Sequence, residues 1–171
     1  SSGHTFLTVV KTNGATSVTQ SFGFYPQSEP SFLDPFAPVT SAIKDNKLQE
    51  MNASIEMSLT ESQFNTLKQN AIARSTHKYQ LGDYNCTNYA LDIFNSLRSS
   101  PILIQPYKVV LPGNANPWSS TEPITVTIGK SPQMLFTKLQ EMKNTNRAES
   151  AKILIDQSHS SHAPRSKGEG D

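Results

Sequence analysis

The chain carries one nucleophile and one candidate base for thiol chemistry. Its only cysteine, Cys86, lies in the run Asn-Cys-Thr-Asn-Tyr, and His4 lies near the N-terminus, before a stretch rich in Thr and Val. A cysteine that a histidine deprotonates can attack a carbonyl carbon and form an acyl-enzyme. These two residues therefore predict a cysteine hydrolase with Cys86 as nucleophile and His4 as base.

The position of Cys86 favours a reactive thiolate. Asn85 is a strong helix-capping residue, and apolar residues recur along one face through Leu97, so a helix is predicted to begin at Cys86. The N-terminus of a helix lowers the pKa of a thiol from its usual value of about 8.5. Its unpaired backbone N–H groups can also hold an oxyanion. We therefore expect the Cys86 amide to be an oxyanion donor, with Asn85 and Tyr84 lining the cleft.

Two strands and a tight turn are predicted to position His4. Residues 4–10 and 17–25 are rich in Thr, Val and Phe, and an Asn-Gly pair between them is a strong hairpin signal. A turn centred on that pair places His4 opposite Gly23 and diagonal to Ser21. The histidine is thus expected at the open end of a β-hairpin.

Strand-like and helix-like patterns follow one another through the rest of the chain. The proline-rich residues 26–45 predict a packed loop that covers the sheet, and Thr60 with Gln63 predicts a capping box. The other predicted elements are a strand at 51–59, a helix at 61–74, the Cys86 helix, strands at 102–111 and 124–128, and a helix at 132–143. This pattern predicts an α+β fold.

Composition excludes several classes of partner. The 171 residues include 15 basic and 14 acidic ones, for a net charge of +1, so no nucleic-acid binding is expected. No apolar run approaches the roughly 20 residues that span a bilayer, so stable membrane insertion is not expected. We predict one domain over residues 1–157 and a disordered tail over 158–171. His159 and His162 supply too few organised ligands for a metal, and no metal or other cofactor is expected.

The order of these motifs resembles a known family. A Gly-His strand, a hairpin, a helix and then Asn-Cys at a helix start, over residues 3–97, are similar to the circularly permuted NlpC-type papain-like hydrolases. That branch includes the lecithin:retinol acyltransferase-like proteins, and in it the histidine precedes the cysteine, as His4 precedes Cys86. The resemblance implies a papain-like fold, with an antiparallel sheet, a nucleophile helix packed against it, and the same two catalytic residues.

The third catalytic residue is less evident. In the resembling family a polar side chain that orients the imidazole usually lies on the strand after the histidine strand. The corresponding segment here, Thr19–Tyr25, contains no His, Asn or Asp. The expected register favours Ser21, with Gln20 next if a bulge shifts the face, and a Cys–His dyad is the alternative. His77, after the helix that ends near Arg74, is a weaker candidate for the base.

One function and two alternatives follow. We expect a cysteine-dependent hydrolase of amide bonds, of the peptidase or peptidoglycan-amidase type, acting on a peptide or peptidoglycan-like substrate. It would suit the toxin domain of a longer secreted bacterial protein, delivered to the periplasm or a target cell, with an inhibitor or immunity protein as partner. The alternatives are a lipid acyl hydrolase or acyltransferase, which the resembling branch includes, and a non-catalytic binding domain in which Cys86 is a small buried side chain.

Overall fold

A computed structural model of the chain describes residues 3–31, 33–46, 49–112, 121–155 and 161–162. These residues form an α+β fold of four helices and small antiparallel sheets, which confirms the predicted class. The helices are α1 (Glu61–Arg74), α2 (Cys86–Asn95), α3 (Pro132–Thr145) and α4 (Arg147–Ser150). The strands are β1 (Leu7–Asn13), β2 (Thr16–Pro26), β3 (Ser41–Asp45), β4 (Glu50–Met51), β5 (Ala53–Ile55), β6 (Tyr107–Leu111), β7 (Ile124–Ile128), β8 (Ile153–Ile155) and β9 (Ser161–His162).

The predicted hairpin is present as β1 and β2, but the predicted register is wrong. Asn13 pairs with Thr16, so the two loop residues begin at Gly14 and not at Asn13. Gly14 has φ +59, a value that hairpin turns of type II′ require at the first loop position and that glycine adopts most readily. The change moves every pairing by two residues, keeps each side chain on its face, and places Ser21 opposite Thr8.

The strand β3 lies inside the segment that was predicted to be a loop. It pairs antiparallel with β2, with Ile43 opposite Phe24, so β2 is the central strand of the order β1-β2-β3. The prolines of this segment precede β3, and the pairing with β2 supplies the backbone partners that make it a strand. Two predicted strands are also shorter than expected, since β5 ends at Ile55 and β6 begins at Tyr107.

The three long helices begin and end near the predicted residues. At α1 the Thr60 hydroxyl accepts a hydrogen bond from the Gln63 N–H, and the Gln63 side chain accepts one from the Thr60 N–H, which confirms the capping box. At α3, Ser131 caps the helix and Pro132 occupies its first turn. None of the helices in the described part of the chain is long and apolar enough to cross a membrane.

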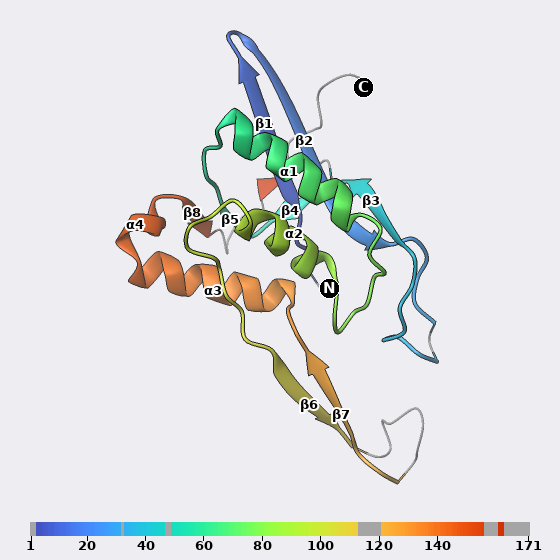
Figure 1. The fold of residues 1–171 in the computed structure, drawn as a ribbon. Helices are drawn as coiled ribbons and strands as arrows, with labels where there is room; N and C mark the ends of the chain where they lie inside the picture. Colours follow the sequence, from blue (N-terminus) through green and yellow to red (C-terminus); the bar gives the residue numbers. More distant parts are fainter. Residues whose placement is uncertain (1–2, 32, 47–48, 113–120, 156–160, 163–171) are drawn as a thin grey trace.

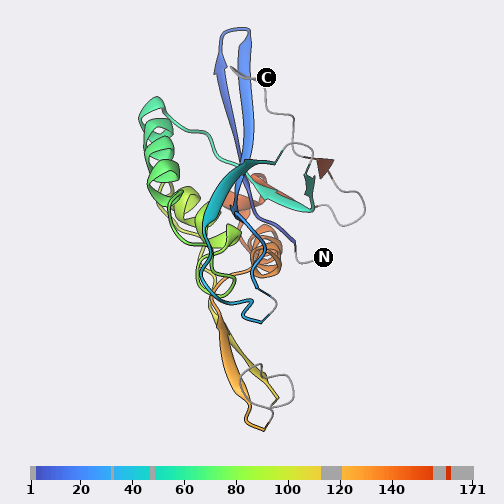
Figure 2. The same cartoon turned by 90° about the vertical axis from the view of Figure 1, so that its right-hand side faces the viewer.

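The helix α2 lies at the centre of the molecule (Figures 1 and 2). The three-stranded sheet and α1 lie on one side of it, and α3 lies on the other. It contributes to two buried clusters. The first contains Phe24, Leu67, Tyr89 and Ile93, and the second contains Leu91, Ile102, Leu139 and Ile153. Because both clusters bury faces of α2, the start of this helix has a fixed position relative to β2 and α3.

Most of the predicted tail, residues 158–171, lies outside the described residues, and so does His159. Within it, Ser161 and His162 form β9, opposite Glu50 and Met51.

The hairpin of β6 and β7 extends away from the helices at the end of the molecule opposite the β1–β2 turn (Figure 1).

Candidate active site

Cys86 is the first residue of α2, and an extensive N-terminal cap fixes its position. The Asn85 side chain accepts hydrogen bonds from the N–H groups of Thr87 (2.9 Å) and Asn88 (3.4 Å), and the Asn88 side chain accepts one from the Asn85 N–H (3.0 Å). The Asn85 amide also donates to two backbone carbonyls outside the helix. Asn85, expected to line the cleft, is 4% exposed and fully engaged in holding the start of α2.

The segment that follows His4 contacts the thiol directly. Cys86 Sγ accepts a hydrogen bond from the backbone N–H of Thr5 and lies 4.0 Å from the Thr87 hydroxyl. The hydroxyls of Thr5 and Thr87 are 2.8 Å apart. The structure therefore brings together the two chain segments that carry the predicted nucleophile and base.

Burial dominates the electrostatics of the thiol. Cys86 is 5% exposed, and desolvation raises its pKa above the usual value, while the hydrogen bonds from Thr5 and Thr87 oppose this shift only in part. The sequence predicts a lowered thiol pKa at a helix N-terminus. The structure gives a raised one, because the loss of water outweighs the nearby donors. The resting group is a neutral thiol at pH 7.

The imidazole of His4 lies between aromatic rings and a polar side chain. Its ring stacks on Tyr25, with centroids 4.3 Å apart, and on Phe6 at 6.0 Å. Desolvation lowers the pKa of His4 from 6.5 to about 4, and the neighbouring Asn46 side chain opposes part of this shift. His4 is therefore neutral at pH 7 and able to accept a proton.

Asn46 is the polar side chain that faces His4, and the sequence analysis did not identify it. Its Oδ1 and His4 Nε2 are both buried, and neither has a hydrogen-bond partner of ordinary geometry among the described residues. Both atoms converge above Gly23, where a Cβ would lie 2.6 Å from Nε2 and closer still to Oδ1. The two atoms are close but form no well-aligned hydrogen bond, and an Nε2–H group that donated to Oδ1 after a small adjustment would satisfy both. The Asn46 N–H donates to the Ser21 carbonyl, and its Nδ2 donates to the Tyr25 hydroxyl.

Ser21, the expected third member, is fully buried in β2. Its hydroxyl lies 2.8 Å from the Thr8 hydroxyl, and its carbonyl holds the backbone of Asn46. Gln20, the next candidate, pairs with Val9 on β1. Asn46 follows β3 directly, so its signal was a polar residue at the end of a short strand that was itself predicted to be part of a loop.

The other expected cleft residue, Tyr84, is half-buried beside the site. Its ring packs edge-on against Phe24, with centroids 5.5 Å apart, and lies 4.7 Å from the ring of His77. Burial raises the pKa of Tyr84 well above its usual range. His77 is exposed at the end of α1, where its N–H donates to the Arg74 carbonyl.

The predicted oxyanion donor, the backbone N–H of Cys86, already has a hydrogen-bond partner in the resting structure. The backbone N–H of Cys86 donates a hydrogen bond to the Tyr79 hydroxyl. Tyr79 is anchored by two backbone hydrogen bonds with Val39, of 2.8 and 2.9 Å, and its ring stacks on Phe24. Burial raises the pKa of Tyr79 to about 12, so the group beside the thiol is a neutral phenol.

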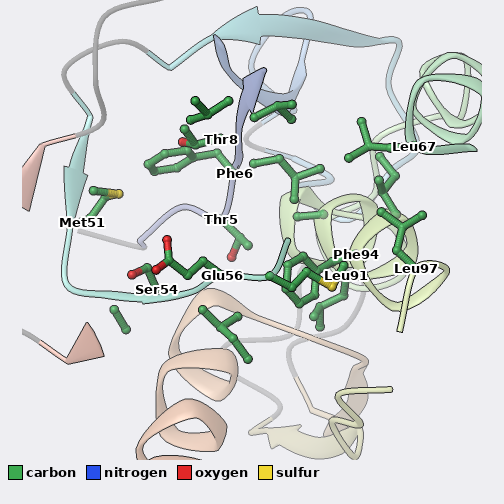
Figure 3. Close-up of a pocket in the computed structure, with 18 of the residues that line it drawn as sticks. Thr5, Phe6, Thr8, Met51, Ser54, Glu56, Leu67, Leu91, Phe94 and Leu97 are labelled. Carbon is green, nitrogen blue, oxygen red and sulfur yellow. The ribbon is translucent and has the colours of Figure 1, made fainter. Parts of the chain in front are cut away.

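An open groove of about 2000 Å³ runs beside β1 (Figure 3). One wall carries apolar side chains of α1 and α2, and the other comes from the segment around β4 and β5. The labelled wall residues are Leu67, Leu91, Phe94, Leu97, Met51, Ser54 and Glu56. His4 and Thr5 contribute to its lining, whereas Cys86 does not. The groove thus offers apolar surface next to the histidine.

No protein-family model, no curated protein and no solved structure matches this chain.

Proposed function

We propose that this chain is a cysteine hydrolase of amide bonds on a permuted papain-like scaffold. Cys86 is the nucleophile, His4 the general base, and Asn46 the residue that orients the imidazole. The observation that carries the proposal is the convergence of His4 Nε2 and Asn46 Oδ1, next to a residue, Thr5, whose N–H bonds to the Cys86 sulfur. A histidine that carries its proton on Nε2 keeps Nδ1 free to accept the thiol proton.

The reaction proceeds through a thioester. His4 takes the proton of Cys86 as the sulfur attacks the carbonyl carbon of a peptide or peptidoglycan-like amide. The oxyanion accepts a hydrogen bond from the Cys86 N–H once the Tyr79 hydroxyl has moved away. His4 then donates the proton to the leaving amine as the C–N bond breaks. A water molecule, deprotonated by His4, hydrolyses the thioester and restores the thiol.

One observation favours a second candidate, a lipid acyl hydrolase or acyltransferase. The groove beside β1 is large, partly apolar and lined in part by His4 and Thr5. An acyl chain would find apolar surface there. The same thiol chemistry would then act on an ester.

Alkylation of the thiol tests the proposed pair. General-base catalysis contributes roughly 10²- to 10⁴-fold to a rate, so His4→Ala should slow labelling of Cys86 by iodoacetamide at pH 7 by more than tenfold. His77→Ala, which changes an exposed histidine at the end of α1, is the matched control and should label at the wild-type rate. Equal labelling rates in wild type and His4→Ala would rule out the proposed hydrolase and favour a binding domain with a buried cysteine.

A second experiment separates the substrates. Wild type and Cys86→Ala are incubated with peptides, peptidoglycan fragments and phospholipids, and intact mass spectrometry records any acyl adduct. An adduct from peptides or peptidoglycan fragments, absent in Cys86→Ala, supports the amide hydrolase. An adduct from phospholipids alone replaces it with the lipid candidate.

A further inference from the structure

One edge of the strand β1 has no neighbour in its sheet. Within the described part of the chain, the sheet order is β1-β2-β3, and β1 pairs with β2 alone. Asn13 and Thr16 flank the two-residue loop of the hairpin, and residues in that position bond to each other. Backbone groups alternate in direction along a strand, so every second residue of β1, counted back from Asn13, bonds to β2. The residues between them direct their N–H and C=O groups to the free edge: Thr8, Val10 and Thr12.

A hydrogen bond on the far side of β2 agrees with this alternation. The Asn46 N–H donates to the Ser21 carbonyl, so Ser21 and every second residue of β2 face β3. The residues of β2 between these face β1, and their partners there are Leu7, Val9, Lys11 and Asn13. The backbone groups at the free edge of β1 have no hydrogen-bond partner among the residues that the structure describes.

The free edge lies in the groove beside β1, and every residue of β1 contributes to the groove lining. Leu7 and Val9 pack against the first buried cluster, which includes side chains of α1 and α2. On that same side Leu67 and Leu97 line the groove (Figure 3). The opposite face of β1 is open, since Val10 is 59% exposed. A strand added at the free edge would therefore meet apolar side chains on one face and solvent on the other.

Backbone donors and acceptors along an apolar groove favour a peptide as the ligand. An extended peptide presents N–H and C=O groups at the spacing of the free edge, whereas an acyl chain presents neither. Its side chains alternate between the two faces of the sheet, so apolar residues at every second position would contact the α1 and α2 side of the groove. The free edge thus distinguishes between the two substrate classes considered above.

We propose that the free edge of β1 binds an extended peptide with apolar side chains at alternate positions, as an added strand of the sheet. The inference rests on the proposed function where it makes this peptide the substrate. Thr5, shortly before β1, lines the same groove, and its N–H bonds to the Cys86 sulfur, so one end of the bound peptide lies beside the thiol. Binding itself needs no reaction and is measured separately.

The experiment measures binding of a fluorescein-labelled peptide, Lys-Thr-Val-Thr-Val-Thr-Val-Lys, to Cys86→Ala by fluorescence anisotropy. Val10→Pro, added to this protein, removes one N–H of the free edge and places a ring there, and an edge strand tolerates proline. It should raise the dissociation constant by about tenfold or more. Val10→Ala is the matched control, because it trims the same exposed side chain and keeps the N–H. It should bind the peptide as Cys86→Ala alone does.

Two methylated forms of the peptide test the pairing without a change in the protein. The N–H groups of a strand point to opposite edges at alternate residues, so N-methylation of one set, the threonines or the valines, should abolish binding. N-methylation of the other set should leave binding unchanged. Equal affinity of the two methylated forms, or no binding of the unmodified peptide to Cys86→Ala, would overturn the inference.

Two further outcomes separate this inference from other readings. A wild-type dimer that Val10→Pro dissociates would replace the peptide by a second copy of the chain, and would overturn the proposal as well. Selective binding to Cys86→Ala, combined with a peptide that wild type leaves uncleaved, would support the docking surface and count against the proposed hydrolase.

Discussion

Replacement of Gly23 by alanine tests whether the close approach of His4 and Asn46 matters for the thiol. Gly23 lies on β2, where it pairs with Lys44 of β3. A Cβ added there would lie 2.6 Å from His4 Nε2 and closer still to Asn46 Oδ1. The backbone of Gly23 is fixed by the β2–β3 ladder, so the two side chains must move apart instead.

The size of the effect follows from this geometry. Comfortable contacts between nonbonded heavy atoms lie at about 3.5 Å or more, so the imidazole must move by about 1 Å. A displacement of that size can reduce a rate by about 10²-fold. Overpacking at such a site costs about 1–3 kcal/mol, and the better strand propensity of alanine offsets about 0.5–1 kcal/mol of this. We expect a net loss of up to about 2.5 kcal/mol in the free energy of unfolding.

The assay is iodoacetamide labelling of Cys86 at pH 7, with urea unfolding of the same samples. Gly129→Ala is the matched control, because a Cβ at Gly129 would meet its nearest atom, the Gly82 carbonyl oxygen, at 3.4 Å, an ordinary contact. It should label like wild type. Folded Gly23→Ala protein that labels at the wild-type rate would refute the argument that the contact between His4 and Asn46 supports the base.

Three further predictions concern stability and can be measured by urea unfolding. Folding lowers the pKa of His4 from 6.5 to about 4, so between these pH values the unfolded chain binds the proton more readily than the folded one. The free energy of unfolding of wild type should therefore fall by up to about 3 kcal/mol as the pH falls from 6.5 to 4. The decrease in His4→Gln should be smaller. Arg98→Met removes the 2.7 Å partner of the largely buried Glu149 carboxylate and leaves it only Lys152 at 3.9 Å, so it should cost about 3 kcal/mol, and adding Glu149→Gln should restore most of it. Asn85→Ala removes a cap and two further hydrogen bonds, so it should cost at least twice the roughly 1 kcal/mol expected for the exposed cap change Thr60→Ala.

Elements with a local signal could be predicted from the sequence. The capping box at Thr60, the Asn85 cap and the Ser131-Pro132 pair each specify a helix start through side chains within one turn, and all three helices begin there. The hairpin was predicted as well, but its register depends on which residues form the loop. Gly14 takes the positive φ at the first loop position, a choice that an Asn-Gly pair leaves open.

Features that depend on distant partners could not be predicted. The strand β3 exists because β2 supplies its hydrogen bonds, while the prolines before it indicate a loop, so Asn46 was hidden. The raised pKa of Cys86 has the same origin. A helix N-terminus can be recognised from the sequence, but the burial of its first residue comes from strands and helices far along the chain.

Burial shifts the pKa values of Cys86 and His4 in directions that disfavour a thiolate–imidazolium ion pair in the resting molecule. It raises the pKa of Cys86 and lowers the pKa of His4, so in the resting molecule the proton stays on sulfur. The N–H of Thr5 and the carbonyl of Asn46 act the other way, because each favours the charged form of the group that it contacts. In the proposed reaction these contacts are in place before charge develops, so they stabilise it without reorganisation as the thiol attacks. The arrangement therefore favours proton transfer that is coupled to attack on an electrophile.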